Sequence, residues 1–155
     1  MDNDKLDFIS LNFISLLKNT DENATAKWGK MNFQQMVEHV ADFFKVSSGK
    51  IQFPLVTTPE NIPRYREFLL SDKAFRENTK APTEVLGEEP LPIRSVDTAA
   101  AIGKLQQEIN EFVSYFENDK NLKTTHPVFG ELNFEEWVLL HYKHVTHHAR
   151  QFGLM

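Results

Sequence analysis

The chain contains no cysteine. This absence excludes disulfide bonds, metal sites built on thiolates and a thiol nucleophile supplied by the protein itself. If the protein binds a metal ion, histidine, aspartate or glutamate side chains must therefore hold it.

Long uninterrupted apolar runs are also missing, so the sequence predicts no membrane-spanning helix. The chain starts Met-Asp-Asn-Asp, without the positive charge that opens a secretory signal, and we expect a cytoplasmic protein. Lysines and arginines are scattered and the formal net charge is -5, which argues against nucleic acid as a partner. There is no phosphate-binding glycine loop and no nucleophile elbow, so nucleotide binding and serine-hydrolase chemistry are disfavoured.

What remains is the composition of an ordinary globular domain. The 155 residues are 41% hydrophobic and 25% charged, a balance that suits one compact hydrophobic core. We therefore expect a single domain over residues 1–155.

Apolar residues recur every three or four positions in four segments, the spacing of a helix with one buried face. The predicted helices are Leu6–Lys18, Phe33–Ser47, a third that opens at Ser95 or Asp97 and ends at Asn118-Asp119, and Phe134–Gln151. Asn32 with Gln35, and Asn133 with Glu136, have the spacing of a capping box at the start of the second and fourth helices. The pattern predicts an all-α fold, a four-helix bundle whose interior can hold a cofactor site.

A long irregular crossing is predicted between the second and third helices. Six of the seven prolines lie between Pro54 and Pro92, where each would break a long helix or strand. The middle of this segment, Asn61–Phe75, has the pattern of a short helix. A loop at His126–Gly130 is expected before the fourth helix.

Four of the six histidines fall in the last predicted helix, at His141, His144, His147 and His148. At about 100° per residue, and with Trp137 as the reference, His144 and His148 lie within about 20° of the inward stripe. His141 lies about 40° from Trp137, and His147 lies near the edge at about 280°. His144 and His148 are one turn apart, the spacing at which two imidazoles can grip one ion.

A third ligand must come from another helix, and His39 is the only histidine in the first three. His39, His144 and His148 would form a three-nitrogen site with open coordination positions, as catalytic metal sites have. Zinc and nickel are the first candidates, with iron, manganese and copper as alternatives.

Other assignments of these residues stay open from the sequence. His141 is a rival for one of the ligand positions. Gln151, Glu38 or His126 could supply a hydrogen bond that fixes the tautomer of a ligand ring. A surface histidine patch or a polar network in the core would explain the run without any metal.

The run His144-Val145-Thr146-His147-His148-Ala149-Arg150-Gln151, preceded by the lone His39, resembles the DinB-like (YfiT-like) superfamily of metalloenzymes. The segments His126–Trp137 and Leu140–His144 resemble one of its uncharacterised branches. The resemblance implies an up-down-down-up four-helix bundle with a long connection between its second and third helices. It also implies a metal triad of one histidine from the second helix and two from the fourth, which are His39, His144 and His148.

Characterised members of that superfamily include bacillithiol or mycothiol S-transferases and a thiol-dependent maleylpyruvate isomerase. The resemblance therefore implies a metal-dependent enzyme in which the ion binds a low-molecular-weight thiol and stabilises its thiolate. It further implies a small-molecule substrate and a homodimer, and it assigns no catalytic residue. The alternative is a non-catalytic metal- or ligand-binding module of the stress response.

Overall fold

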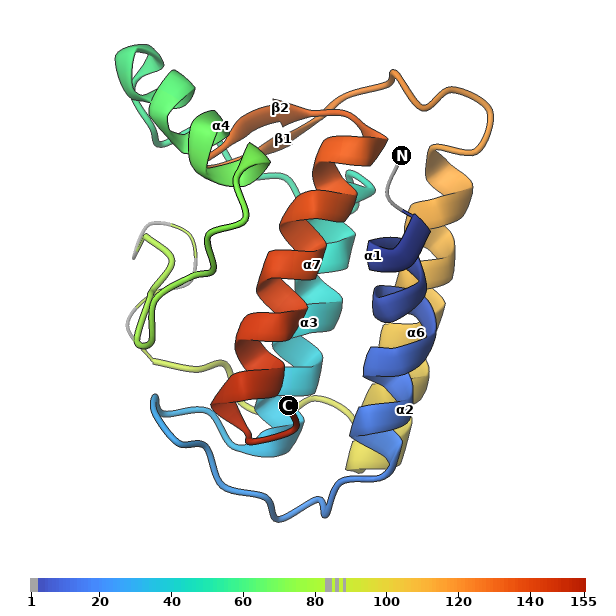
Figure 1. The fold of residues 1–155 in the computed structure, drawn as a ribbon. Coiled ribbons are helices and arrows are strands. Elements are labelled where there is room, and N and C mark those ends of the chain that lie inside the picture. The colour runs from blue at the N-terminus through green and yellow to red at the C-terminus, as the bar shows by residue number, and fades with distance from the viewer. Residues whose placement is uncertain (1–2, 83–84, 86, 88) are drawn as a thin grey trace.

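The computed structural model describes residues 3–82, 85, 87 and 89–155, and this part of the chain is mostly helical (Figure 1). In chain order the elements are α1 (Asn3–Asp7), η1 (Phe8–Asn12), α2 (Phe13–Lys18), α3 (Phe33–Ser47), η2 (Pro59–Asn61), α4 (Ile62–Leu70), α6 (Thr98–Tyr115), β1 (Thr124–His126), β2 (Gly130–Leu132) and α7 (Phe134–Gln151). The π-helical η1 joins α1 to α2 without a break. No helix in the described ranges is both long and apolar enough to cross a membrane.

The segment α1–η1–α2 and the helices α3, α6 and α7 lie side by side (Figure 1). Helices α3 and α6 run in one direction, while α7 and the N-terminal segment run in the other. Large aromatic side chains fill the space between them, and Phe44, Phe112 and Trp137 are fully buried. Phe112 on α6 packs on Phe44 of α3 and on Phe134 of α7, with ring centroids 5.6 and 5.2 Å apart.

Side-chain caps fix where the long helices start. The Gln35 backbone N–H donates to Asn32 Oδ1 at 2.8 Å, and the Asn32 N–H donates back to Gln35 Oε1 at 2.9 Å. Asn133 and Glu136 form the same reciprocal pair at the start of α7. Each capping box thus gives acceptors to two backbone N–H groups that the first turn of the helix leaves without one. Both predicted capping boxes, and with them the starts of α3 and α7, are confirmed.

The third and the short predicted helices differ in extent from the sequence prediction. Helix α6 begins after Asp97, which accepts from the Ala100 N–H at 2.8 Å, so Ser95 is not the cap. It ends at Tyr115, before Asn118. Helix α4 covers less than Asn61–Phe75, because the Ser71 hydroxyl donates to the Phe68 carbonyl at 2.7 Å and the chain turns extended there.

A two-stranded hairpin precedes α7, where the sequence predicted only a loop. Strands β1 and β2 pair antiparallel with Thr124 opposite Leu132. Three-residue strands are too short to show an alternating pattern, so periodicity could not reveal them. The hairpin is tied to the helices, because Thr124 Oγ1 accepts from Trp137 Nε1 and donates to the Ser47 carbonyl, both at 2.7 Å.

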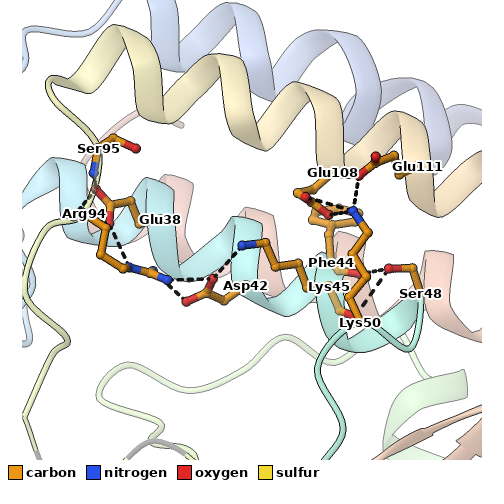
Figure 2. Close-up of polar contacts among 10 residues, drawn as sticks. All are labelled: Glu38, Asp42, Phe44, Lys45, Ser48, Lys50, Arg94, Ser95, Glu108 and Glu111. Carbon is orange, nitrogen blue, oxygen red and sulfur yellow. Dashed lines mark hydrogen bonds and ion pairs between the residues drawn. The ribbon is translucent and has the colours of Figure 1, made fainter.

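The end of the crossing is fastened to α3 by charged side chains (Figure 2). The Glu38 carboxylate accepts from the backbone N–H groups of Arg94 at 2.8 Å and of Ser95 at 3.2 Å. The Arg94 guanidinium continues to Asp42, whose carboxylate accepts at 2.7 Å. Just after the end of α3, Lys50 pairs with two glutamates of α6, at positions 108 and 111. These contacts fix the segment that leads into α6.

Candidate metal centre

Three histidines from two helices meet inside the helical layer. His39 lies on α3, and His144 and His148 lie one turn apart on α7. His144 Nε2 is 3.0 Å from His39 Nε2 and 3.1 Å from His148 Nε2. One ring nitrogen from each histidine falls within 4.8 Å of the other two. The structure thus brings together the three residues that the sequence singled out.

Packing holds the central ring in place. Phe43 of α3 stacks on the His144 ring with centroids 4.2 Å apart and planes 29° apart. The rings of His39 and His148 each meet the His144 ring edge to face. His144 and His148 are buried, with 7% and 5% of their surface exposed, whereas His39 is partly exposed. The cluster is therefore enclosed by α7 and reaches solvent on the His39 side.

Gln151 determines which nitrogen of His148 carries the proton. The Gln151 amide nitrogen donates to the Trp28 carbonyl at 2.9 Å, so its oxygen points the other way. That oxygen lies 2.6 Å from His148 Nδ1, which must then be the N–H donor. The neutral ring consequently presents the Nε2 lone pair to the cluster. Of the three residues proposed from the sequence for this role, Gln151 makes the contact.

A loop that the sequence analysis did not single out holds Gln151 in turn. Trp28 accepts from the amide, and the next residue, Gly29, has a φ of +82° that side chains with a Cβ rarely adopt. A Cβ at Gly29 would lie 2.8 Å from the Gln151 amide nitrogen. Gly29 therefore lets the loop pass close to Gln151, and a lone glycine in a turn-like stretch gave no signal of this role.

Burial keeps all three imidazoles uncharged at neutral pH. Burial lowers the pKa of His39 to about 4, although the charge of Asp42 acts in the opposite direction. Burial, followed by the repulsion of His148 and His39, holds the pKa of His144 well below its usual range. Burial and the neighbouring His39 likewise lower the pKa of His148 well below that range. The neutral ring, with a free lone pair, is the form that binds metal ions.

Hydrogen bonds alone do not satisfy the cluster. His144 Nε2 can carry one proton at most, so its two contacts with ring nitrogens cannot both be good hydrogen bonds. A cation between the rings would accept all three lone pairs. Nitrogens bound to one tetrahedral zinc stand about 3.3 Å apart, given bonds of about 2.0–2.1 Å. The observed 3.0 and 3.1 Å fall within a few tenths of that spacing, and the donor set suits a borderline divalent metal.

His141, the rival ligand, points elsewhere. Its Nε2 lies 2.9 Å from Ser47 Oγ, and its ring stacks on Phe44 with centroids 3.8 Å apart. The Ser47 hydroxyl donates to the Phe44 carbonyl at 2.7 Å, so it accepts from His141 Nε2–H. His141 is therefore a buried packing residue of α7. It contacts the C-terminal end of α3 and lies away from His39.

The remaining candidates also lie outside the cluster. His126 Nδ1 accepts from the backbone N–H groups of Val128 and Phe129 and so closes the hairpin turn. Glu38 points toward Arg94 and Ser95 and makes no contact with a histidine among the described residues. His147 faces Trp28, with ring centroids 5.6 Å apart. The expectation that Glu38 or His126 orients a ligand ring is therefore wrong.

Comparison with known proteins gives a family but no activity. The chain belongs to the family described as "Protein of unknown function (DUF1569)", whose model matches residues 1–155. No curated protein and no solved structure matches the chain. The function has to be argued from the site itself.

Proposed function

We propose that this DUF1569 protein binds one divalent metal ion through His39, His144 and His148. The observation that carries the proposal is the convergence of three neutral ring nitrogens on one point, where His144 Nε2 has at most one proton for its two contacts. Gln151 supports it, because a ligand histidine commonly donates its other N–H to an oxygen that fixes the ring. Zinc or nickel suits three imidazoles best, and iron, manganese or copper remain alternatives.

We further propose that the fold is a DinB-like (YfiT-like) four-helix bundle in up-down-down-up order. The directions of the helices in Figure 1 support this, since the second and third run together and the first and fourth run against them. The long crossing between α3 and α6 is the connection that such an order requires. The ligand positions, one on α3 and two on α7, match those that the resemblance implies.

The activity we propose is thiol-dependent transfer to a small electrophile. A divalent ion with open coordination positions lowers the pKa of a bound thiol and so keeps the thiolate available at neutral pH. The thiolate sulfur bonds to the electrophilic carbon, the leaving group departs with its bonding electron pair, and the thiol proton passes to solvent. The partly exposed His39 side offers the approach, and the thiol must come from a cosubstrate because the chain has no cysteine.

Elemental analysis of the purified chain tests the metal first. One ion per chain in the wild type and loss of that ion in His39→Ala support the proposal, and a wild type without any affinity for divalent metals overturns it. Zinc- and nickel-loaded protein is then assayed with bacillithiol, glutathione or coenzyme A and a chlorodinitrobenzene electrophile. Thiol-dependent chloride release that His39→Ala abolishes supports the transferase. A bound ion without turnover in any combination favours the non-catalytic binding module instead.

A further inference from the structure

A cavity next to α7 lies beside the histidine cluster and is separate from it. This cavity of about 210 Å³ adjoins the last turns of the helix, and none of the three clustered histidines lines it. Its walls come from segments far apart in the sequence. Trp28 belongs to the loop after α2, Phe75 to the crossing, and His147 and Arg150 to α7. The fold, rather than any local motif, creates this space.

The cavity contains a cation without a partner. Within the described ranges, Arg150 Nη2 is buried and donates to no acceptor, and no ion pair reaches this guanidinium. A buried charged donor left without an acceptor is unfavourable, so an acceptor from outside the chain would stabilise it. Arginine is also the side chain best shaped to bind a carboxylate through two parallel hydrogen bonds.

Three charged side chains line the cavity, two of them cationic and one anionic. Lys27 and Arg150 are cationic, Glu77 is anionic, and Lys27 makes no ion pair in the described part of the chain. The excess of one cationic side chain over the anionic one favours a monoanion over a doubly charged phosphate.

The other walls are flat and apolar. The rings of Trp28 and Phe75 both face His147, with centroids 5.6 and 5.9 Å from its ring. We propose that this cavity binds a small monocarboxylate with a short apolar body, its carboxylate between Arg150 and Lys27 and its body against the aromatic rings. The proposal stands on the cavity alone and goes beyond metal binding.

Tryptophan fluorescence provides the measurement, because Trp28 lines the cavity and the only other tryptophan, Trp137, is fully buried. The full chain is titrated with butyrate, with 1-butanol as the uncharged analogue, and with inorganic phosphate as a charge without an apolar body. We expect a saturable change with butyrate and a response at least about tenfold weaker with the other two probes. The signal should be absent in Trp28→Phe.

Charge variants test the placement of the carboxylate. Arg150→Gln should weaken butyrate binding about tenfold or more, and Lys27→Gln about two- to threefold because Lys27 is exposed. Glu77→Gln should strengthen it. Lys104→Gln, which removes an exposed positive charge on α6, should leave it unchanged.

Butyrate binding can be tested independently of metal binding. His39→Ala should lose the ion and keep the butyrate response. A missing or unsaturable response, tighter binding of phosphate than of butyrate, or equal affinity in folded Arg150→Gln would each overturn the monocarboxylate site. If Arg150→Gln does not fold, unchanged affinity in both Lys27→Gln and Glu77→Gln overturns it instead.

Discussion

Glu38 and His39 are consecutive residues on α3, yet they enter two different kinds of polar environment. Glu38 accepts from two backbone N–H groups and from the side chain of Arg94 (Figure 2). It also accepts from the side chain of Gln34. His39 meets the ring nitrogen of His144, which meets His148 in turn. On the Glu38 side every charge faces a complementary group. On the His39 side three groups of the same kind face one another.

The difference separates a structural network from a binding site. A buried network whose members all have partners stabilises the fold and needs nothing more. A buried cluster of like groups is unfavourable until something of opposite character enters it. Substitutions on the two sides should therefore change different quantities, the free energy of unfolding on one and the affinity for metal on the other.

Removal of the central ring should have the largest effect. In His144→Ala we expect the bound metal to fall from about one ion per chain to almost none, because the two remaining imidazoles lie on different helices and cannot hold one ion tightly. Elemental analysis of the purified protein measures this, and circular dichroism checks that the helices persist.

His147→Gln is the matched control, since its ring lies next to His148 and outside the cluster. It should retain the ion. If both His144→Ala and His39→Ala still bound one metal ion per chain, the ion would have to bind elsewhere.

On the other side of α3, Glu38→Ala should lower the free energy of unfolding by about 2–3 kcal/mol, because two backbone donors lose a charged acceptor. Urea denaturation of the metal-free protein measures the change. Glu111→Ala, which removes an exposed carboxylate, should leave the free energy of unfolding close to that of the wild type. Metal content should stay the same in both variants.

The same residue gives a dependence on pH. Burial tends to raise the pKa of Glu38, but hydrogen bonds from Gln34, Ser95 and Arg94, together with the charge of Arg94, lower it below 4.5. A carboxylate with a lowered folded-state pKa stabilises the fold above its unfolded pKa and loses that contribution as the pH falls through the folded value. The stability gap between wild type and Glu38→Ala should therefore be full at pH 7 and narrow below pH 4.5. A gap that widens in acid would contradict the assignment.

Gln151→Leu should weaken metal binding without loss of a ligand. The His148 ring would lose the acceptor at its Nδ1–H, and loss of such a partner typically costs about ten- to a hundredfold in metal affinity. Competition with a chromogenic chelator measures the affinity. Gln151→Glu keeps an acceptor oxygen for His148 but loses the donor to the Trp28 carbonyl, so it should recover part of the loss. Identical affinities in the two variants would exclude this role for Gln151.

A small effect is expected at Lys50, an exposed residue that pairs with the exposed Glu111 and the buried Glu108 of α6. Its side chain is 41% exposed, and an exposed ion pair adds about 0–1 kcal/mol. Lys50→Met should change the free energy of unfolding by less than about 1 kcal/mol, and the change should shrink further in high salt. A larger loss would mean that surface charges hold α3 to α6 as firmly as the Glu38 network holds the crossing.

The sequence predicted the parts of this molecule that depend on local chemistry. Capping boxes at Asn32 and Asn133 marked the starts of α3 and α7, because a cap is recognised from four consecutive residues. Helical spacing also selected His144 and His148. It could not separate them from His141, whose angular position differs from that of His148 by only about 20°. The separation comes from α3, which places His39 opposite His144 in the middle of the helix and Ser47 opposite His141 at its C-terminal end.

Contacts between distant segments were beyond such reasoning. The loop of Trp28 and Gly29 reaches Gln151 across more than a hundred residues, and no spacing rule connects them. The partnership of Glu38 with Arg94 likewise depends on the path of a proline-rich crossing without a regular pattern. The hairpin strands, of three residues each, are too short to show a regular pattern in the sequence.

The two capping boxes also set how the chain tolerates insertions and deletions. His39 follows its cap by about two turns of helix and His144 follows its cap by about three, so each histidine keeps a fixed rotation relative to the residue that starts its helix. One residue added between Asn32 and His39 would swing the imidazole about 100° away from α7. The same addition between Ile51 and Thr57, outside every helix, would leave all three rings in place. Length variation among related chains should therefore collect in the crossing and avoid the first two turns of α3.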